Sequence, residues 1–223
     1  MDLLRASFYM WRRLKKAAPE TEEEMNNTVS RTRKITVTAM LSALAFVLQF
    51  LEFGIPIMPS FIKLDFSDLP ALIGAFALGP VSGVMIELVK NVLHLFVTSS
   101  GGVGEISNFV LGALFVLPAG LIYKHHKTRK NALIGSLVGA VLSSCLSVVT
   151  NYFFVYPVYT AFMPMETIVA MYQAIRPSTK NLLEALIVFN VPFTFVKEMI
   201  SVIITFLIYK RISPILKGTG KAA

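Results

Sequence analysis

Long apolar stretches alternate with short charged or polar segments over most of this 223-residue chain. A membrane-spanning helix needs about 20 apolar residues, because it rises about 1.5 Å per residue and the hydrocarbon layer is about 30 Å thick. The pattern predicts helices in five apolar stretches, at about residues 35–53, 69–97, 106–123, 132–157 and 183–209. Such a series is typical of a membrane domain.

The second stretch is too long for one upright helix, and Gly79-Pro80 near its middle marks one helix end and a new start. If the chain crosses twice here, the main basic clusters all fall on one side: Arg31, Arg33, Lys34, Lys124, Lys127, Arg129, Lys130, Lys210 and Arg211. Cytoplasmic loops collect Lys and Arg. We therefore predict an all-α membrane protein with six transmembrane helices and both termini in the cytoplasm. The helix at about 69–79 is too short to span upright, so it is expected to be tilted or to line a cavity.

The composition agrees with this interpretation, since 55% of the residues are hydrophobic and 15% are charged, against about 25% charged in soluble domains. The formal net charge of +8 is assigned to cytoplasmic loops, and nucleic acid is not an expected partner. The one cysteine, Cys145, lies in an apolar run and is expected to be buried. The sequence has no phosphate-binding loop, His-Glu-x-x-His or Gly-x-Ser-x-Gly motif, so energy for any uptake must come from a partner.

Three charges and a serine lie between two apolar runs in residues 63–70, Lys-Leu-Asp-Phe-Ser-Asp-Leu-Pro. We expect this segment at a membrane face, over a pocket for a polar small molecule. Pro56, Pro59 and Pro70 flank this segment and the residues just before it. The predicted lid consists of Asp65, Phe66 and residues 58–61, closing over the ligand.

Polar side chains inside apolar runs are costly unless paired, which makes them candidate functional residues. Glu87 and Lys90 are three residues apart on one helix face, and they either neutralise each other or contact a ligand. Asn108 lies near the outer end of its helix, and Asn151 begins an aromatic-rich run. An amide beside aromatic rings suits a planar heteroaromatic ligand, because amides bind ring edges and aromatics cover ring faces.

In the last apolar stretch, Asn190, Thr194 and Lys197 share one helical stripe. An uncompensated ammonium group in an apolar run is costly. We therefore expect Lys197 to face a polar ligand, or otherwise to pair with Glu87 or Glu198.

Together these residues resemble the substrate-binding S components of energy-coupling factor (ECF) transporters, in particular those that bind riboflavin. The resemblance covers about residues 33–213. It rests on Ala39-x3-Ala43, residues 63–70, Gly79-Pro80, the Glu87–Lys90 helix, residues 104–109, Asn151, and residues 192–197.

The resemblance implies a six-helix S-component fold in a prokaryotic plasma membrane, with riboflavin captured near the outer face as a transported ligand. It implies no separate cofactor and no metal. It further implies that Ala39 and Ala43 dock onto a membrane-embedded T component, which couples to two cytoplasmic ATPases. The predicted domains are a cytoplasmic extension over residues 1–33, which the resemblance does not explain, the membrane domain over 34–213, and a cytoplasmic tail over 214–223.

Among the implied ligand contacts, Asn151 and Lys197 match the family's pattern best. Thr194 stands where the family often has Asn, and Asn190, one turn earlier, offers an amide instead. The implied ligand-binding set is Phe61, Leu64, Asp65, Phe66, Glu87, Lys90, Asn108, Asn151, Asn190, Thr194 and Lys197.

Two other interpretations remain open at this point. One is an S component for another flavin or vitamin, such as FMN or a thiamin-like ring. The other is an intramembrane enzyme with Glu87 or Glu198 as acid or base, although no second catalytic partner stands at motif spacing. A purified protein that is yellow would favour a flavin ligand.

Overall fold

The computed structural model describes residues 27–98, 101–161 and 163–217. The chain divides into two compact units, Met1–Val37 and Thr38–Ala223. The described part of the first unit is helical and begins the first helix, Asn27–Phe50. The second unit contains every other element and both cavities described below.

The predicted break at Gly79-Pro80 is confirmed. Helix α2, Asp68–Leu78, ends at Gly79, and α3, Pro80–His94, begins directly afterwards. Gly79 has a φ of 109°, which a residue with a side chain rarely adopts. Pro80 occupies the first turn of α3, where its missing N–H costs nothing. The two helices therefore follow each other without a loop.

Helices α4, Val103–His125, and α5, Arg129–Thr150, pack closely because small residues line their contact. A Cβ added at Gly139 would collide with the backbone carbonyl of Phe115. Ser143 Oγ donates a hydrogen bond of 3.0 Å to the Leu111 carbonyl of the facing helix. Small side chains thus let two backbones approach, as is common between membrane helices.

One π-helical turn follows α5 and another precedes the last long helix. After α5 come η2, Asn151–Val155, and α6, Tyr156–Tyr159. The last run consists of α8, Leu182–Ala185, η3, Leu186–Asn190, and α9, Val191–Lys217. π-Turns are rare and frequently occur at functional sites.

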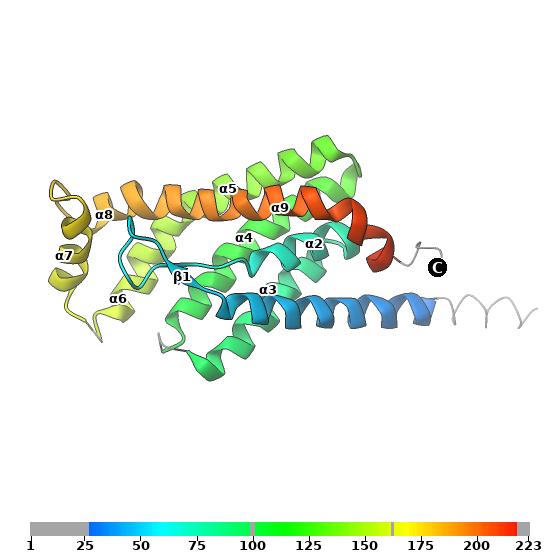
Figure 1. Cartoon of the computed structure of the whole chain (residues 1–223), viewed down its shortest axis with the longest axis horizontal. Coiled ribbons are helices and arrows are strands. Elements are labelled where there is room, and N and C mark those ends of the chain that lie inside the picture. Colours follow the sequence, from blue (N-terminus) through cyan, green and yellow to red (C-terminus); the bar gives the residue numbers. More distant parts are fainter. Residues whose placement is uncertain (1–26, 99–100, 162, 218–223) are drawn as a thin grey trace, which may run out of the picture. The chain divides into compact units, whose positions relative to one another are not determined.

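Two elements lie in segments that the sequence analysis left as loops. A two-stranded antiparallel hairpin pairs β1, Phe53–Gly54, with β2, Lys63–Leu64. Helix α7, Met165–Ile175, lies between α6 and α8. In Figure 1 the hairpin and α7 lie toward the start of α9, while the α4–α5 connection lies toward its end.

Five described helices are long and apolar enough to cross a membrane: Asn27–Phe50, Pro80–Val97, Val103–His125, Arg129–Tyr159 and Leu182–Leu216. Helix α2 is apolar but shorter, as the sequence predicted. Pro80–Val97 includes the short 3₁₀ turn η1, Leu95–Val97. The expectation that Cys145 is buried was wrong, because its side chain is exposed on the surface of α5.

Candidate functional site

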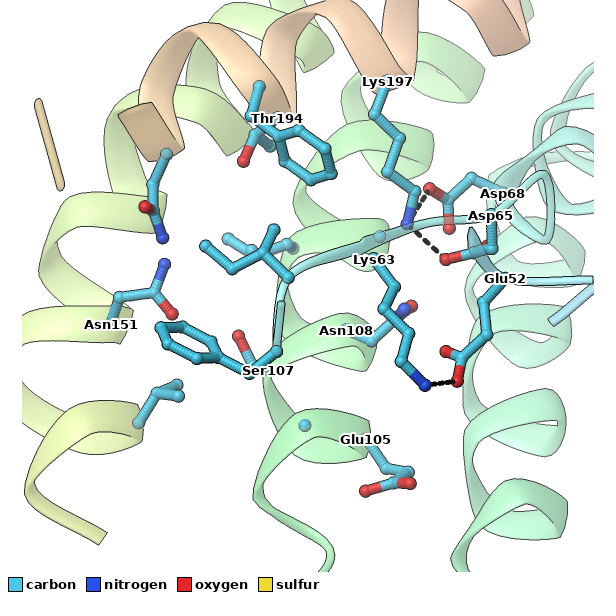
Figure 2. A pocket seen from close by; sticks show the side chains of 18 of the residues that line it. Glu52, Lys63, Asp65, Asp68, Glu105, Ser107, Asn108, Asn151, Thr194 and Lys197 are labelled. Atoms are coloured by element: carbon cyan, nitrogen blue, oxygen red, sulfur yellow. Dashed lines mark hydrogen bonds and ion pairs between the residues drawn. The ribbon is translucent and has the colours of Figure 1, made fainter. Parts of the chain in front are cut away.

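A cavity of about 240 Å³ lies between the hairpin, α3, α4, η2 and α9. Seven residues of the predicted ligand-binding set line it: Phe61, Asp65, Asn108, Asn151, Asn190, Thr194 and Lys197. Figure 2 shows Asn151 on one side of this space, Lys197 with its two aspartates on the other, and Asn108 on α4. Residues more than a hundred positions apart in the sequence thus surround one space.

Four residues of the predicted set lie outside the cavity lining. Leu64 is buried, and the ring of Phe66 packs against Phe53 with centroids 6.1 Å apart. Glu87 and Lys90 are fully buried behind the cavity and form an ion pair of 2.7 Å. The ion pair between Glu87 and Lys90 favours the structural alternative for these two residues, and the ligand contacts predicted for Leu64 and Phe66 stay predictions.

A chain of buried charges connects the hairpin to three helices. Lys90 Nζ donates to Ser67 Oγ at 2.7 Å and to Asp68 Oδ1 at 2.6 Å. Lys197 Nζ lies 2.9 Å from Asp65 Oδ2 and 3.2 Å from Asp68 Oδ2. Asp68 is therefore held between two ammonium groups. Buried charges are stable only when paired in this way.

The partners of Lys197 differ from those predicted. Glu87 or Glu198 is the partner predicted as the alternative to a ligand, whereas the observed partners are Asp65 and Asp68 (Figure 2). Asp65 is itself fixed by the backbone N–H of Ser67 at 2.8 Å. Asp65 thus anchors the end of the hairpin in this structure, and its predicted part in a lid stays a prediction.

Two amides come from the π-helical turns. Asn151 opens η2, Asn190 closes η3, and both side chains are buried at the cavity wall. Asn190 Oδ1 accepts a hydrogen bond of 2.8 Å from the Tyr172 hydroxyl, which also bonds Tyr156. This bond orients the Asn190 side chain and leaves its NH₂ group for another partner. Burial raises the pKa of Tyr172 well above its usual range, so its hydroxyl stays neutral.

Asn108 and Glu198 also place unsatisfied oxygens at the cavity. Asn108 Oδ1 and Glu198 Oε2 are buried and have no hydrogen-bond partner among the described residues. Buried polar atoms without a partner are uncommon in native proteins. These atoms mark places where a polar ligand or water would be accommodated.

Sequence reasoning missed part of the cavity wall. Gln49 is a polar residue inside an apolar run, the signal that found Asn151, and it lines the cavity. His94 pairs with Glu105 through Nδ1 at 2.8 Å, and both line the cavity. Glu52 and Lys63 form an ion pair at its edge (Figure 2).

Comparisons with known proteins identify the family of the chain. Residues 33–209 match the family model described as ECF transporter, substrate-specific component. The chain belongs to this family. As an S component it is a multi-pass membrane protein of a bacterial plasma membrane, which agrees with its five long apolar helices.

Named relatives and a solved structure place it within the family. The chain is 33% identical over 190 residues to the riboflavin transporter RibU of Staphylococcus aureus (strain TCH60), and this match covers 85% of this chain and 95% of that protein. It is 32% identical over 187 residues to the riboflavin transporter FmnP of Bacillus subtilis (strain 168), covering 82% and 94%. A solved structure of the S component of a bacterial ECF transporter matches with a TM-score of 0.67 and 32% identity. That match covers 84% of this chain and 99% of the other. The family resemblance stated from the sequence is confirmed.

Proposed function

We propose that this S component captures riboflavin in the cavity between the hairpin, η2 and α9, as the substrate-binding subunit of an ECF importer. The observation that supports this most is the cavity itself. It presents the buried amide of Asn151 opposite the ammonium group of Lys197, in a chain 33% identical to a riboflavin transporter. Riboflavin is cargo here, and we propose no resident cofactor.

The chemistry of the lining suits an isoalloxazine ring and a hydroxylated side chain. Asn151 offers a donor and an acceptor to the alternating ring edge, and Asn190 offers the NH₂ group that Tyr172 leaves unused. Phe61 lies 6.2 Å from both Tyr156 and Tyr159, centroid to centroid, and these rings can cover the ring faces. The cavity of about 240 Å³ is below the roughly 300–1,000 Å³ of typical ligand sites, so we propose that the hairpin shifts to admit the ligand.

For the membrane topology we propose six helices, with the short α2 as the second and both termini in the cytoplasm. The positions of the basic residues in the sequence support this layout. Within it, residues 34–213 form the ligand-binding membrane domain, and residues 1–33 and 214–223 are cytoplasmic. Most of the proposed extension, residues 1–26, lies outside the residues that the structure describes.

We propose no enzymatic activity. Glu87, one of two acid–base candidates, is fully buried against Lys90 behind the cavity. Glu198 lines the cavity, but a catalytic acid or base needs a second positioned group. Two other carboxylates at the cavity, Asp65 and Asp68, are both held by Lys197.

The ligand released from the purified protein tests this function. Protein purified in mild detergent from cells grown with riboflavin is expected to be yellow, and chromatography of the denatured protein should release riboflavin. Release of FMN or of a thiamin-like compound would assign the cavity to that ligand instead. A colourless protein that does not quench riboflavin fluorescence would contradict the proposal.

Asn151→Leu is expected to weaken riboflavin binding by about fivefold to 150-fold, because a ring-edge group loses its partner in a buried site. Fluorescence-quenching titration measures the change. The matched control is Asn131→Leu, a half-buried residue in the first turn of α5 that does not line the cavity, which should bind like the parent. Equal affinities of parent and Asn151→Leu would remove Asn151 from the site.

Tyr172→Phe is expected to weaken riboflavin binding by about threefold to tenfold, because Asn190 loses the hydroxyl that orients it. Tyr152→Phe removes a hydroxyl from an exposed side chain of η2 and serves as control. Unchanged affinity in Tyr172→Phe would show that the Asn190 orientation does not matter for binding.

For partners we propose a membrane-embedded T component and two cytoplasmic ATPases, docked through Ala39 and Ala43. Both alanines are exposed on the first helix, where another helix can approach closely. Ala39→Val with Ala43→Val should leave riboflavin binding intact and abolish uptake in cells that contain the partners. Ala170→Val, at an exposed position of α7, should transport normally. Normal uptake by the double variant would exclude this docking face.

A further inference from the structure

A second cavity of about 600 Å³ lies between α2, the end of α4, the start of α5 and the later part of α9. Lys210 of this cavity is 13 residues from Lys197 along α9, about 20 Å at 1.5 Å per residue. The second cavity is therefore distinct from the proposed riboflavin site. It is called the basic cavity below.

The inner wall of the basic cavity is apolar and aromatic. The Phe76 ring lies 4.9 Å from that of Tyr123 and 6.0 Å from that of Tyr209, centroid to centroid. Leu207 lines the cavity and is 73% exposed, so the space opens onto the outer face of α9. An apolar space that opens sideways in a membrane protein is accessible to a lipid acyl chain.

The remaining lining is cationic. Lys127, Arg129 and Lys210 line the cavity and are exposed, and none of the lining residues is acidic. Over the described residues, no ion pair involves any of these three cations. Three unneutralised positive charges around one space attract an anion.

Thr205 provides an independent observation inside the basic cavity. Its side chain is 1% exposed and lines the cavity, and its Oγ1 has no hydrogen-bond partner in the described part of the chain. A buried hydroxyl without a partner is costly. A ligand oxygen at this depth would satisfy it.

We propose that the basic cavity binds an anionic phospholipid. The phosphate lies among Lys127, Arg129 and Lys210, the Thr205 hydroxyl donates to an ester carbonyl of the glycerol, and an acyl chain covers the aromatic wall. The phosphate chemistry alone would also fit a free anion. The apolar wall and its sideways opening favour the lipid, because a free anion leaves that surface uncovered.

The test compares two variants of equal charge in a neutral detergent. In the first, Lys127→Gln, Arg129→Gln and Lys210→Gln remove the cations of the cavity. In the control, Lys124→Gln, Lys130→Gln and Arg211→Gln remove three exposed neighbours that do not line it. The probes are dioctanoyl phosphatidylglycerol, dioctanoyl phosphatidylcholine and inorganic phosphate, and the readout is the thermal unfolding midpoint during titration.

Phosphatidylglycerol should raise the midpoint of the parent and the control variant more than phosphatidylcholine does. The affinity for phosphatidylglycerol should fall about a hundredfold in the cavity variant, because this is the usual contribution of three basic residues near an anionic lipid. Thr205→Val should also weaken binding. Equal loss in both triple variants would overturn the proposal, since it would indicate general charge attraction. A full effect from inorganic phosphate alone would overturn the assignment to a lipid.

Discussion

Lys90→Met is expected to destabilise the protein by about 3–5 kcal/mol, the usual cost of removing one partner from a buried ion pair. Lys90 is fully buried and neutralises Glu87 and Asp68, so its loss leaves Glu87 without a cation. Because whole domains are stable by only about 5–15 kcal/mol, this loss should lower the unfolding temperature clearly. Fluorescence-detected gel filtration of detergent extracts, heated in steps, measures the loss.

Two companion variants separate charge from packing. Lys63→Met breaks the exposed pair with Glu52, and exposed pairs contribute only about 0–1 kcal/mol. Glu87→Gln combined with Lys90→Met removes the stranded carboxylate and should recover part of the stability. If Lys90→Met is as stable as Lys63→Met, the buried charge chain does not hold the fold together.

Lys197→Met is expected to weaken riboflavin binding about tenfold to a hundredfold, since a buried hydrogen bond to a charged group is lost. The structure adds a second consequence. Lys197 also fixes Asp65 at the end of the hairpin, so its removal should loosen the hairpin. Binding is measured by fluorescence quenching on protein whose gel-filtration profile matches the parent.

Asp65→Asn tests whether the effect on binding comes from the hairpin alone. It breaks the hairpin anchor but leaves Lys197 with Asp68 at the cavity. Binding by Asp65→Asn should therefore be weakened less than by Lys197→Met. In the parent, riboflavin should slow limited proteolysis of residues 54–62. Both variants should be cleaved in this segment faster than the parent. Equal losses of affinity in the two variants would mean that Lys197 only positions the hairpin.

The helices could be predicted from the sequence because lipid imposes a length and a composition on each one. The same constraint revealed the break at Gly79-Pro80, where only glycine adopts the observed backbone and proline fits the next first turn. Candidate site residues followed from polar groups in apolar runs, and Asn151 and Lys197 do line one cavity.

The partners of those residues could not be predicted in the same way. Lys197 pairs with Asp65 across 132 positions, and no local pattern specifies such a contact. Residues 158–182 lie between two long apolar stretches and were predicted as a loop, which hid α7 and the hydroxyl of Tyr172 that orients Asn190. Glu87 and Lys90 met the criterion for functional residues, yet they stabilise the fold behind the cavity. Ionisable residues inside the membrane indicate a charge network, and geometry decides which of them face the ligand.

The most direct test of riboflavin capture is a titration of ligand-free protein in detergent with riboflavin, followed by ligand fluorescence. We expect quenching that saturates at one riboflavin per chain, is reproduced by the Asn131→Leu control, and is weakened in Asn151→Leu. Thiamin in excess should not compete. Riboflavin fluorescence that stays unchanged at all protein concentrations, or quenching that is equal in Asn151→Leu and the parent, would contradict the assignment of this cavity.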